Sequence, residues 1–196
     1  MDDVNLTDIL SRYHVPRHRL TVADYRRLGE ARILGKDDRV ELLEGQLVDM
    51  SPIGPRHALT IDLLNRLLPA TLGEQAWLRV QNPIVLDDAS EPQPDLAVVQ
   101  HPWSGYPDVH PRPSDILLLI EVADSSLEFE LGAKLELYAR AGIREFWVVD
   151  LTSNRVLVHR RPHDGRYDSI TTVEVSGRLQ IEALPGVTIS AAQIFI

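Results

Sequence analysis

The chain has 196 residues, of which 44% are hydrophobic, and it carries a formal net charge of −9 at pH 7. This length and composition exclude collagen, a coiled coil and a disordered chain, and they allow one sizeable hydrophobic core. The absence of cysteine excludes disulfides and thiolate zinc sites. The negative charge argues against a protein that coats nucleic acid through bulk positive charge, although it leaves room for a local basic groove.

The sequence shows neither a membrane-spanning run nor the pattern of a signal peptide. No apolar run approaches the roughly 18 residues that span a bilayer, and the N-terminus lacks the basic and then apolar order of a signal peptide. We therefore expect a soluble cytoplasmic protein without a membrane partner. Residues 1–20 are predicted to form a loosely docked arm, and residues 21–196 a single domain.

The first half of this domain alternates helical and strand patterns. T-V-A-D at Thr21 resembles a capping box and predicts a helix that runs to about Gly35. RVELLEGQLVDM predicts a hairpin that turns at Glu44-Gly45. Apolar residues at helical spacing then predict a second helix between Pro55 and Gly73.

Two strands are predicted next, over WLRVQNPIVL and DLAVV, and a surface loop over residues 101–115. ILLLIEVA, residues 116–123, lacks alternation, which is typical of a strand buried on both faces. A helix over about 127–141, with S-S-L-E as its capping box, precedes a further buried strand, REFWVVD. The remaining segments RVLVHRR, YDSITTVE and RLQIEAL predict antiparallel strands. The expected fold class is therefore α/β, a mixed central sheet flanked by helices with an antiparallel C-terminal extension.

Common catalytic motifs are missing. The sequence has no phosphate-binding G-x-x-x-x-G-K-[ST] loop, no G-x-G-x-x-G turn and no G-x-S-x-G elbow. Both histidine pairs at four-residue spacing enclose a proline, which disfavours a helical zinc pair. His57 lies in the first turn of a predicted helix, where a capping or solvated histidine is the simpler interpretation and an accessory functional role stays open.

Two carboxylates are predicted at the ends of neighbouring strands. Asp95 stands at a strand entrance behind Pro94, which restricts the backbone before it. Glu121 continues the apolar run Ile116–Ile120, where burial of an unpaired carboxylate would cost several kcal/mol. A turn residue and a strand end that reaches solvent are the simpler alternatives for Asp95 and Glu121, respectively.

Lys134 is one of only two lysines among 20 basic residues. At 100° per residue it falls in the middle of the apolar stripe of its predicted helix. The stripe residues within about 60° of it are Leu127, Leu131, Leu137, Tyr138 and Ala141. Glu130 lies one turn earlier on the same face. Because the helix directly follows the strand of Glu121, Lys134 should point at the sheet and need a carboxylate there.

Asp95, Glu121 and Lys134 together would make a cluster that binds a metal and stabilises charge. Two carboxylates suit Mg²⁺, which completes its coordination with water and phosphate oxygens. A nearby ammonium can stabilise developing negative charge or orient an attacking water. The chemistry indicated is metal-dependent phosphodiester hydrolysis.

The spacing of these residues resembles a known signature. Pro94-Asp95 and Glu121-Val122 are similar to the PD-(D/E)XK signature of restriction-endonuclease-like nucleases, whose lysine usually stands two residues after the glutamate, here Ala123. The order PD, EV, S-S, ELGAK, LYARAG and EFWVVD resembles instead one branch of that superfamily. This branch is the family of putative restriction endonucleases of unknown function that is greatly expanded in cyanobacteria, and it carries its lysine on the following helix, as Lys134 does. The likeness covers roughly residues 20–165, including VELLEGQLVDMSP and the histidine of GPRHALTIDLL.

The resemblance implies a restriction-endonuclease-like fold in which Asp95 and Glu121 are metal ligands and Lys134 is the catalytic cation. Glu41 in VELLEG matches the acidic residue that the family places near its site. Glu130 stands where the family usually has aspartate, and with His57 it is an accessory candidate. The leading hypothesis is a DNA endonuclease that depends on Mg²⁺ or Mn²⁺.

Two other interpretations stay open. The chain could be a catalytically inactive nuclease-like module that binds nucleic acid or a protein partner, which the acidic charge and Ala123 favour. Asp95, Glu121 and Lys134 could also form a purely structural ion pair, and truncating one partner would then cost about 3–5 kcal/mol of stability. If the chain cuts both strands of a duplex, two sites related by a twofold axis are the simplest arrangement, which suggests a homodimer.

Overall fold

The computed structural model describes residues 17–35, 37–101 and 109–195. Most of the predicted N-terminal arm, residues 1–16, lies outside the described residues, as does part of the predicted surface loop, residues 102–108. Among the residues that the structure describes, no helix is both long and apolar enough to cross a lipid bilayer.

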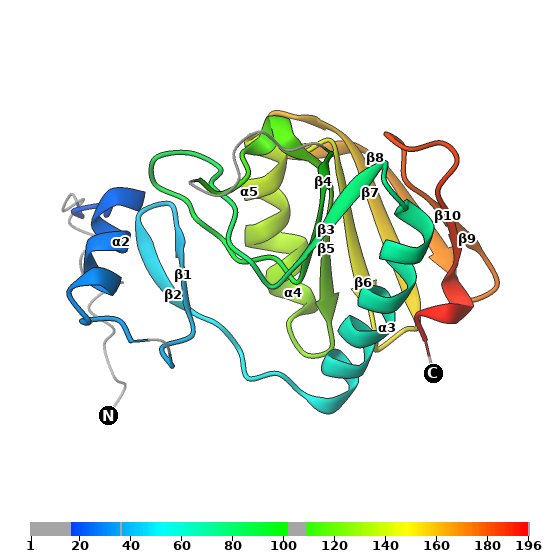
Figure 1. Cartoon of the computed structure of the whole chain (residues 1–196), viewed down its shortest axis with the longest axis horizontal. Coiled ribbons are helices and arrows are strands. Elements are labelled where there is room, and N and C mark those ends of the chain that lie inside the picture. The colour runs from blue at the N-terminus through cyan, green and yellow to red at the C-terminus, as the bar shows by residue number, and fades with distance from the viewer. Residues whose placement is uncertain (1–16, 36, 102–108, 196) are drawn as a thin grey trace, which may run out of the picture.

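A six-stranded mixed sheet forms the centre of the molecule, in the order β3-β4-β5-β6-β7-β8 (Figure 1). Strands β5 and β6 are parallel, and every other neighbouring pair is antiparallel. The six strands are β3 (Ala76–Val80), β4 (Leu96–Gln100), β5 (Ile116–Ala123), β6 (Glu145–Asp150), β7 (Arg155–His163) and β8 (Arg166–Glu174). The predicted α/β fold with a mixed sheet is confirmed.

Helices cover both faces of the sheet. Helix α3 (Pro55–Leu72) packs on one face, and its buried leucines share a hydrophobic cluster with Ile120 of β5. The connection between β5 and β6 covers the other face and consists of α4 (Leu127–Phe129), the π-helical turn η2 (Glu130–Lys134) and α5 (Leu135–Arg140). A parallel strand pair requires such a crossover, because a tight hairpin cannot return the chain in the same direction.

Smaller elements stand at the two ends of the sheet. Helix α2 (Val22–Glu30) and the hairpin of β1 (Val40–Leu43) and β2 (Gln46–Asp49) form a lobe beside it (Figure 1). The predicted capping box is present, since Thr21 and Asp24 bond reciprocally. At the other end lie β9 (Arg178–Gln180), β10 (Thr188–Ser190) and the short helix η3 (Ala191–Gln193); a further short helix, η1 (Pro113–Asp115), precedes β5.

Three local predictions differ from the structure. The strand expected over residues 77–86 ends at Val80, because Gln81 adopts a left-handed φ of 47° and Pro83 has no N–H to continue the ladder. The first helix ends at Glu30 rather than near Gly35, since Arg32 has a φ of 56°. The capping box expected at residues 125–128 is not formed: the N-cap is Ser126, and its side chain makes no capping bond.

Candidate active site

The candidate site is built around Glu121 and Asp95, which two antiparallel strands bring side by side. Leu96 pairs with Ile120, so the residue just before β4 meets Glu121 near the end of β5. The Asp95 N–H donates to Glu121 Oε2 at 3.1 Å, and the Val122 N–H donates to Asp95 Oδ2 at 2.9 Å. The two carboxylates are therefore fixed by reciprocal backbone hydrogen bonds, and the predicted neighbourhood of Asp95 and Glu121 is confirmed.

Lys134 reaches Glu121 from the helical connection between β5 and β6, which covers this face of the sheet. Its Nζ donates to Glu121 Oε1 at 2.9 Å and lies 3.5 Å from Glu41 Oε1 and 3.9 Å from Glu130 Oε2. Glu121 and Lys134 are only 2% and 4% exposed. Lys134 ends the π-helical turn, a distortion that is frequent at functional sites and that the 100° rotation rule does not predict.

Tyr138, one turn after Lys134, was missed as a site residue by sequence reasoning. Its hydroxyl donates to Glu121 Oε1 at 2.7 Å, the oxygen that Lys134 also contacts. The signal was present, because Tyr138 shares the face of Lys134, but an aromatic residue in an apolar stripe is ordinarily part of the core. Two donors on Oε1 leave Oε2 of Glu121 facing Asp95.

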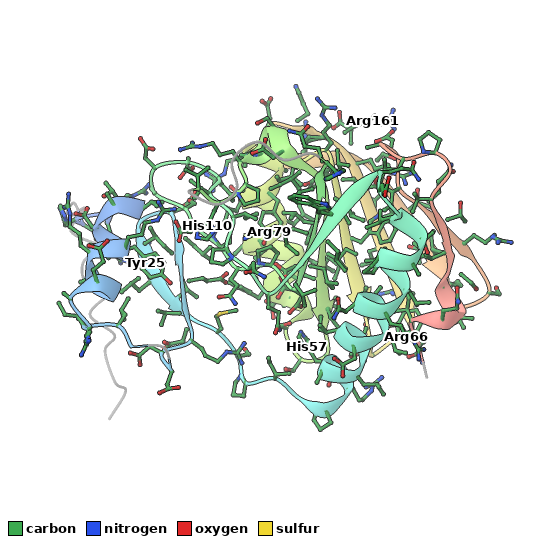
Figure 2. All side chains as sticks on the ribbon, viewed as in Figure 1. Tyr25, His57, Arg66, Arg79, His110 and Arg161 are labelled. Atoms are coloured by element: carbon green, nitrogen blue, oxygen red, sulfur yellow. The ribbon has the colours of Figure 1, made fainter. Side chains whose placement is uncertain are left out.

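His57 also belongs to the site. Its Nε2 lies 2.9 Å from Asp95 Oδ2, and its buried Nδ1 has no partner among the described residues. Figure 2 places His57 at the N-terminal end of α3, beside the strands. Gln81 Nε2 approaches the other oxygen of Asp95, Oδ1, at 3.4 Å. The simpler sequence interpretation of His57 as a capping or solvated histidine is therefore wrong.

Glu41 enters the site from the N-terminal lobe. It lies on β1, it is almost fully buried, and its Oε2 accepts the Gln93 N–H at 3.0 Å. The resemblance alone had pointed to Glu41, since no periodicity in the sequence relates a hairpin residue to a helix more than 90 positions later. The lobe thus contributes a carboxylate to a cluster on the central sheet.

An open cleft of about 740 Å³ connects these side chains to solvent. It runs between the β1–β2 hairpin, the start of α3 and the segment from residue 121 to residue 134. The predicted site residues that line it are Glu41, His57, Asp95, Glu121, Glu130 and Lys134. The structure therefore brings every sequence-predicted candidate to one cleft, whereas their individual roles stay predictions.

The charges in the cleft are unbalanced. The carboxylates of Glu41, Glu121 and Glu130 contact one ammonium group, that of Lys134, and Asp95 lies next to Glu121. Burial, reinforced by the carboxylate of Glu130, raises the pKa of Glu121 well above its usual range, and burial also raises the pKa of Glu130 to about 7. The surrounding carboxylates, Glu121 foremost, outweigh burial and raise the pKa of Lys134, so its side chain stays charged.

Asp95 differs from the other acids. Burial would raise its pKa, but the hydrogen bond and charge of His57 and the Val122 N–H outweigh that effect, so its pKa lies below the usual value. Asp95 is therefore ionised at neutral pH. It is the carboxylate best prepared to meet a cation without first losing a proton.

The donor set fits a hard divalent cation. Asp95 Oδ1 has only a long contact with Gln81, and the buried Glu130 Oε2 has no hydrogen-bond partner among the described residues. Carboxylate oxygens with spare acceptor capacity and excess negative charge suit Mg²⁺ or Mn²⁺, which complete their coordination with water and phosphate oxygens. Within the described part of the chain, no trio of His, Asp or Glu side chains already converges on one ion position. The protein ligands would thus be Asp95 and Glu121.

Known proteins resemble this chain both in fold and in sequence. A crystal structure of a putative nuclease from Anabaena variabilis is similar in fold, with a TM-score of 0.70 and 14% sequence identity. The match covers 90% of this chain and 97% of that one. No curated protein matches the sequence. A family model described as putative restriction endonuclease matches residues 22–192, which span the sheet and every site residue named above. The chain therefore belongs to the Uma2 family of putative restriction endonucleases.

Proposed function

We propose that this protein is an endonuclease that hydrolyses phosphodiester bonds of DNA with the help of Mg²⁺ or Mn²⁺. The observation that carries the proposal is the convergence of Asp95, Glu121 and Lys134 at the floor of an open cleft. Family membership supports a nuclease, and the donor set supports a hard divalent cation. DNA as the substrate and the identity of the ion belong to the proposal.

Each side chain has a distinct role in this proposal. Asp95 and Glu121 would hold the ion, which when bound supplies an activated water and neutralises charge on the scissile phosphate. Lys134 carries a permanent positive charge within 2.9 Å of Glu121, where it can stabilise the negative charge that develops on the phosphoryl oxygens. Tyr138 and the Asp95 N–H keep the Glu121 carboxylate in one orientation.

Two further residues contact the acids without lying at the reacting atoms. His57 orients Asp95 through Oδ2, whereas Oδ1 has only the long contact with Gln81. Glu41, anchored by the Gln93 N–H, limits the movement of the Lys134 ammonium and adds negative charge that favours a cation. Positioning of this kind typically changes metal affinity or activity 10- to 100-fold when it is removed.

The cleft must also accept a polyanion despite the net charge of −9. Arg39 lines the cleft on the side of the β1–β2 hairpin and is exposed. Arg56, in the first turn of α3, forms an ion pair at 3.1 Å with Asp124, another lining residue. Arg39 is suited to contact a backbone phosphate, because Arg binds phosphate oxygens in a planar, bidentate manner, whereas Arg56 would first have to release Asp124 and the Leu151 carbonyl.

The alternative is a nuclease-like module that binds nucleic acid or a protein without cutting it. It is favoured by one observation: Glu121 Oε1 already accepts hydrogen bonds from Lys134 and Tyr138 without an ion. The two functions differ in their dependence on the ion, since a binding module would need none.

Plasmid nicking tests the proposal. The wild type, Glu121→Gln and Lys134→Met would be incubated with supercoiled plasmid in Mg²⁺, in Mn²⁺ and in EDTA, with Glu74→Gln as the matched control, since Glu74 is exposed and does not line the cleft. We expect nicking by the wild type and the control only when the ion is present, and loss of nicking in the two site variants. Equal nicking by all four proteins would show that the activity lies elsewhere, and plasmid binding without nicking would favour the alternative.

A further inference from the structure

Strand β8 is the outermost strand of the sheet and leaves one edge open. It pairs with β7 on one side over nearly its whole length, and it is the last strand in the order of the sheet (Figure 1). Nine residues long, Arg166–Glu174 is nearly twice as long as the opposite edge strand, β3, which has five. A long, regular edge strand presents a row of unpaired N–H and C=O groups, which is a template for another strand.

Strand β8 lacks several of the usual protections of an edge strand, and its charged residues include both signs. Its sequence, RYDSITTVE, contains no proline, glycine or lysine. No residue of β8 has a positive φ, whereas Arg161 on the neighbouring β7 does. Six of its nine residues are exposed, among them Ile170 at 62%. The strand combines high β-propensity with an exposed β-branched side chain at its centre.

The two ends of β8 carry opposite charges that have no partner. Within the part of the chain that the structure describes, the side chains of Arg166 and Glu174 form no ion pair and no hydrogen bond. Both are exposed, and they stand at equal distances from Ile170 along the strand. This symmetry is what an antiparallel contact between two identical strands requires.

We propose that β8 pairs with β8 of a second copy of this chain, antiparallel, around a twofold axis at Ile170. In this register Ile170 faces Ile170, and Arg166 of each copy faces Glu174 of the other. Directly opposite charges and β-branched side chains stabilise such a pair. Two six-stranded sheets thereby become one continuous sheet in which the β8 edge of each copy is paired and only the β3 edges remain.

Neighbouring registers are disfavoured by charge. A twofold axis perpendicular to the sheet keeps each side chain on its own face, so the register can shift only by an even number of residues. A shift by two in one direction places Glu174 opposite Asp168, and in the other direction opposite Asp164. Like charges in direct opposition destabilise strand pairs. The sequence of β8 thus selects the register centred on Ile170 over its neighbours.

The pairing also fixes the distance between the two candidate sites. Glu121 aligns with Val148, Val148 with Leu157, and Leu157 with Thr172 across the sheet. Seven strand spacings of about 4.8 Å separate β5 of one copy from β5 of the other, which gives roughly 35 Å between sites on the same face. This is close to one turn of a DNA duplex, about 34–36 Å. The relevance of that spacing rests on the proposed function, whereas the pairing itself does not.

Charge reversal tests the pairing. Analytical ultracentrifugation over a concentration series would compare the wild type with Arg166→Glu, Glu174→Arg and the double variant. Each single change replaces two attractive pairs with two repulsive ones per dimer, so we expect the dissociation constant to rise roughly tenfold or more. The double variant restores opposite charges and should return to the wild-type value. Monomeric wild type throughout the series, or a dimer indifferent to all three changes, would overturn the proposal.

Cysteine cross-linking tests the register independently. Because the sequence has no cysteine, Ile170→Cys would place a single thiol on the proposed axis, directly opposite its copy and within reach of a disulfide. Thr172→Cys is the matched control, since its copies would lie four residues out of register. Mild oxidation should give a covalent dimer for position 170 and much less for position 172. Equal or reversed yields would overturn the register, and nicking assays on the same proteins would report on the catalytic proposal separately.

Discussion

Two buried glutamates on adjacent parallel strands show how differently this fold uses a carboxylate. Glu145 at the start of β6 is 1% exposed, and Glu121 near the end of β5 is 2% exposed. Glu145 accepts hydrogen bonds from Trp147 Nε1 at 2.7 Å and from Arg160, and its second oxygen accepts the Glu182 N–H at 2.7 Å. The charge of Glu145 is balanced by one guanidinium, and both of its oxygens have hydrogen-bond donors, so this cluster has no free acceptor for a ligand.

The Glu121 cluster is neither balanced nor closed. The Lys134 ammonium contacts the carboxylates of Glu41, Glu121 and Glu130, Oε2 of Glu130 has no hydrogen-bond partner in the described chain, and the cluster opens into a cleft. Glu145 shows that this fold can bury a carboxylate with a full set of hydrogen bonds and one cation. The excess of acidic groups around Lys134 is not required for the fold, because unbalanced buried charge costs stability. The Glu145 cluster links β6 to Arg160 of β7 and to the backbone of Gln180 and Glu182, whereas the open Glu121 cluster supports the proposal that it binds a ligand.

The largest effect on stability is expected at the balanced cluster. Arg160→Met leaves the Glu145 carboxylate buried without its cation, so we expect a loss of about 3–5 kcal/mol in the free energy of unfolding. Denaturant unfolding measures it, with exposed Arg161→Met, labelled in Figure 2, as the control that should change by less than about 0.5 kcal/mol. If the free energy of unfolding falls no more for Arg160→Met than for the control, the ion pair between Arg160 and Glu145 does not stabilise the fold.

The largest effect on activity is expected at Lys134. Removal of a charge-stabilising group at a reacting centre typically lowers kcat about 10²–10³-fold, and we expect this for Lys134→Met in plasmid nicking. Lys134→Arg keeps the charge but replaces the compact ammonium with a larger planar guanidinium at a buried position, so we expect activity to fall in this variant as well. Full activity in the arginine variant would mean that charge alone suffices, and full activity in the methionine variant would contradict the assignment.

A smaller effect is expected when the hydroxyl of Tyr138 is removed. Tyr138→Phe keeps the packing of the ring and deletes one hydrogen bond to Glu121. Loss of an outer contact of this kind typically reduces metal affinity about 10- to 100-fold, while stability should change by only about 1 kcal/mol. Titration of Mn²⁺ into the two proteins checks the first number. If affinity is unaltered, Tyr138 packs in the core and does not position Glu121.

The smallest effect is a dependence of stability on pH at Glu130. Its pKa is raised to about 7 from 4.5, so the folded protein favours the protonated carboxyl. The stability that protonation contributes is fully present below pH 4.5 and is lost as the pH rises through about 7. In metal-free buffer Glu130→Gln should therefore be more stable than the wild type above pH 7, by about 1–2 kcal/mol, and this advantage should shrink toward pH 5. Exposed Glu128→Gln should show no such trend.

The fold could be predicted from sequence wherever one period dominated. The unbroken apolar run of β5, the turn at Glu44-Gly45 and the amphipathic pattern around Lys134 each left one simple solution. The end of β3 could not be predicted, because it depends on the left-handed conformation of Gln81, a residue type that rarely adopts it.

The site was predictable only in its local part. Lys134 and Glu121 could be paired because a strand and the helix that follows it must pack together. The contact between His57 and Asp95 joins residues 38 positions apart, and Glu41 arrives on a separate lobe, so neither follows from local periodicity. Tyr138 was hidden for another reason: its ring satisfies the apolar pattern while its hydroxyl serves the site.

Mn²⁺ binding to the isolated protein tests the central claim most directly. Electron paramagnetic resonance would follow the loss of the free-ion signal for the wild type, Asp95→Asn, Glu121→Gln and the control Glu74→Gln, an exposed residue away from the cleft. If the unbalanced cluster exists for a cation, the wild type and the control bind Mn²⁺ and both site variants lose that binding while they remain folded. Equal binding by all four proteins, or no binding by the folded wild type, would contradict the account.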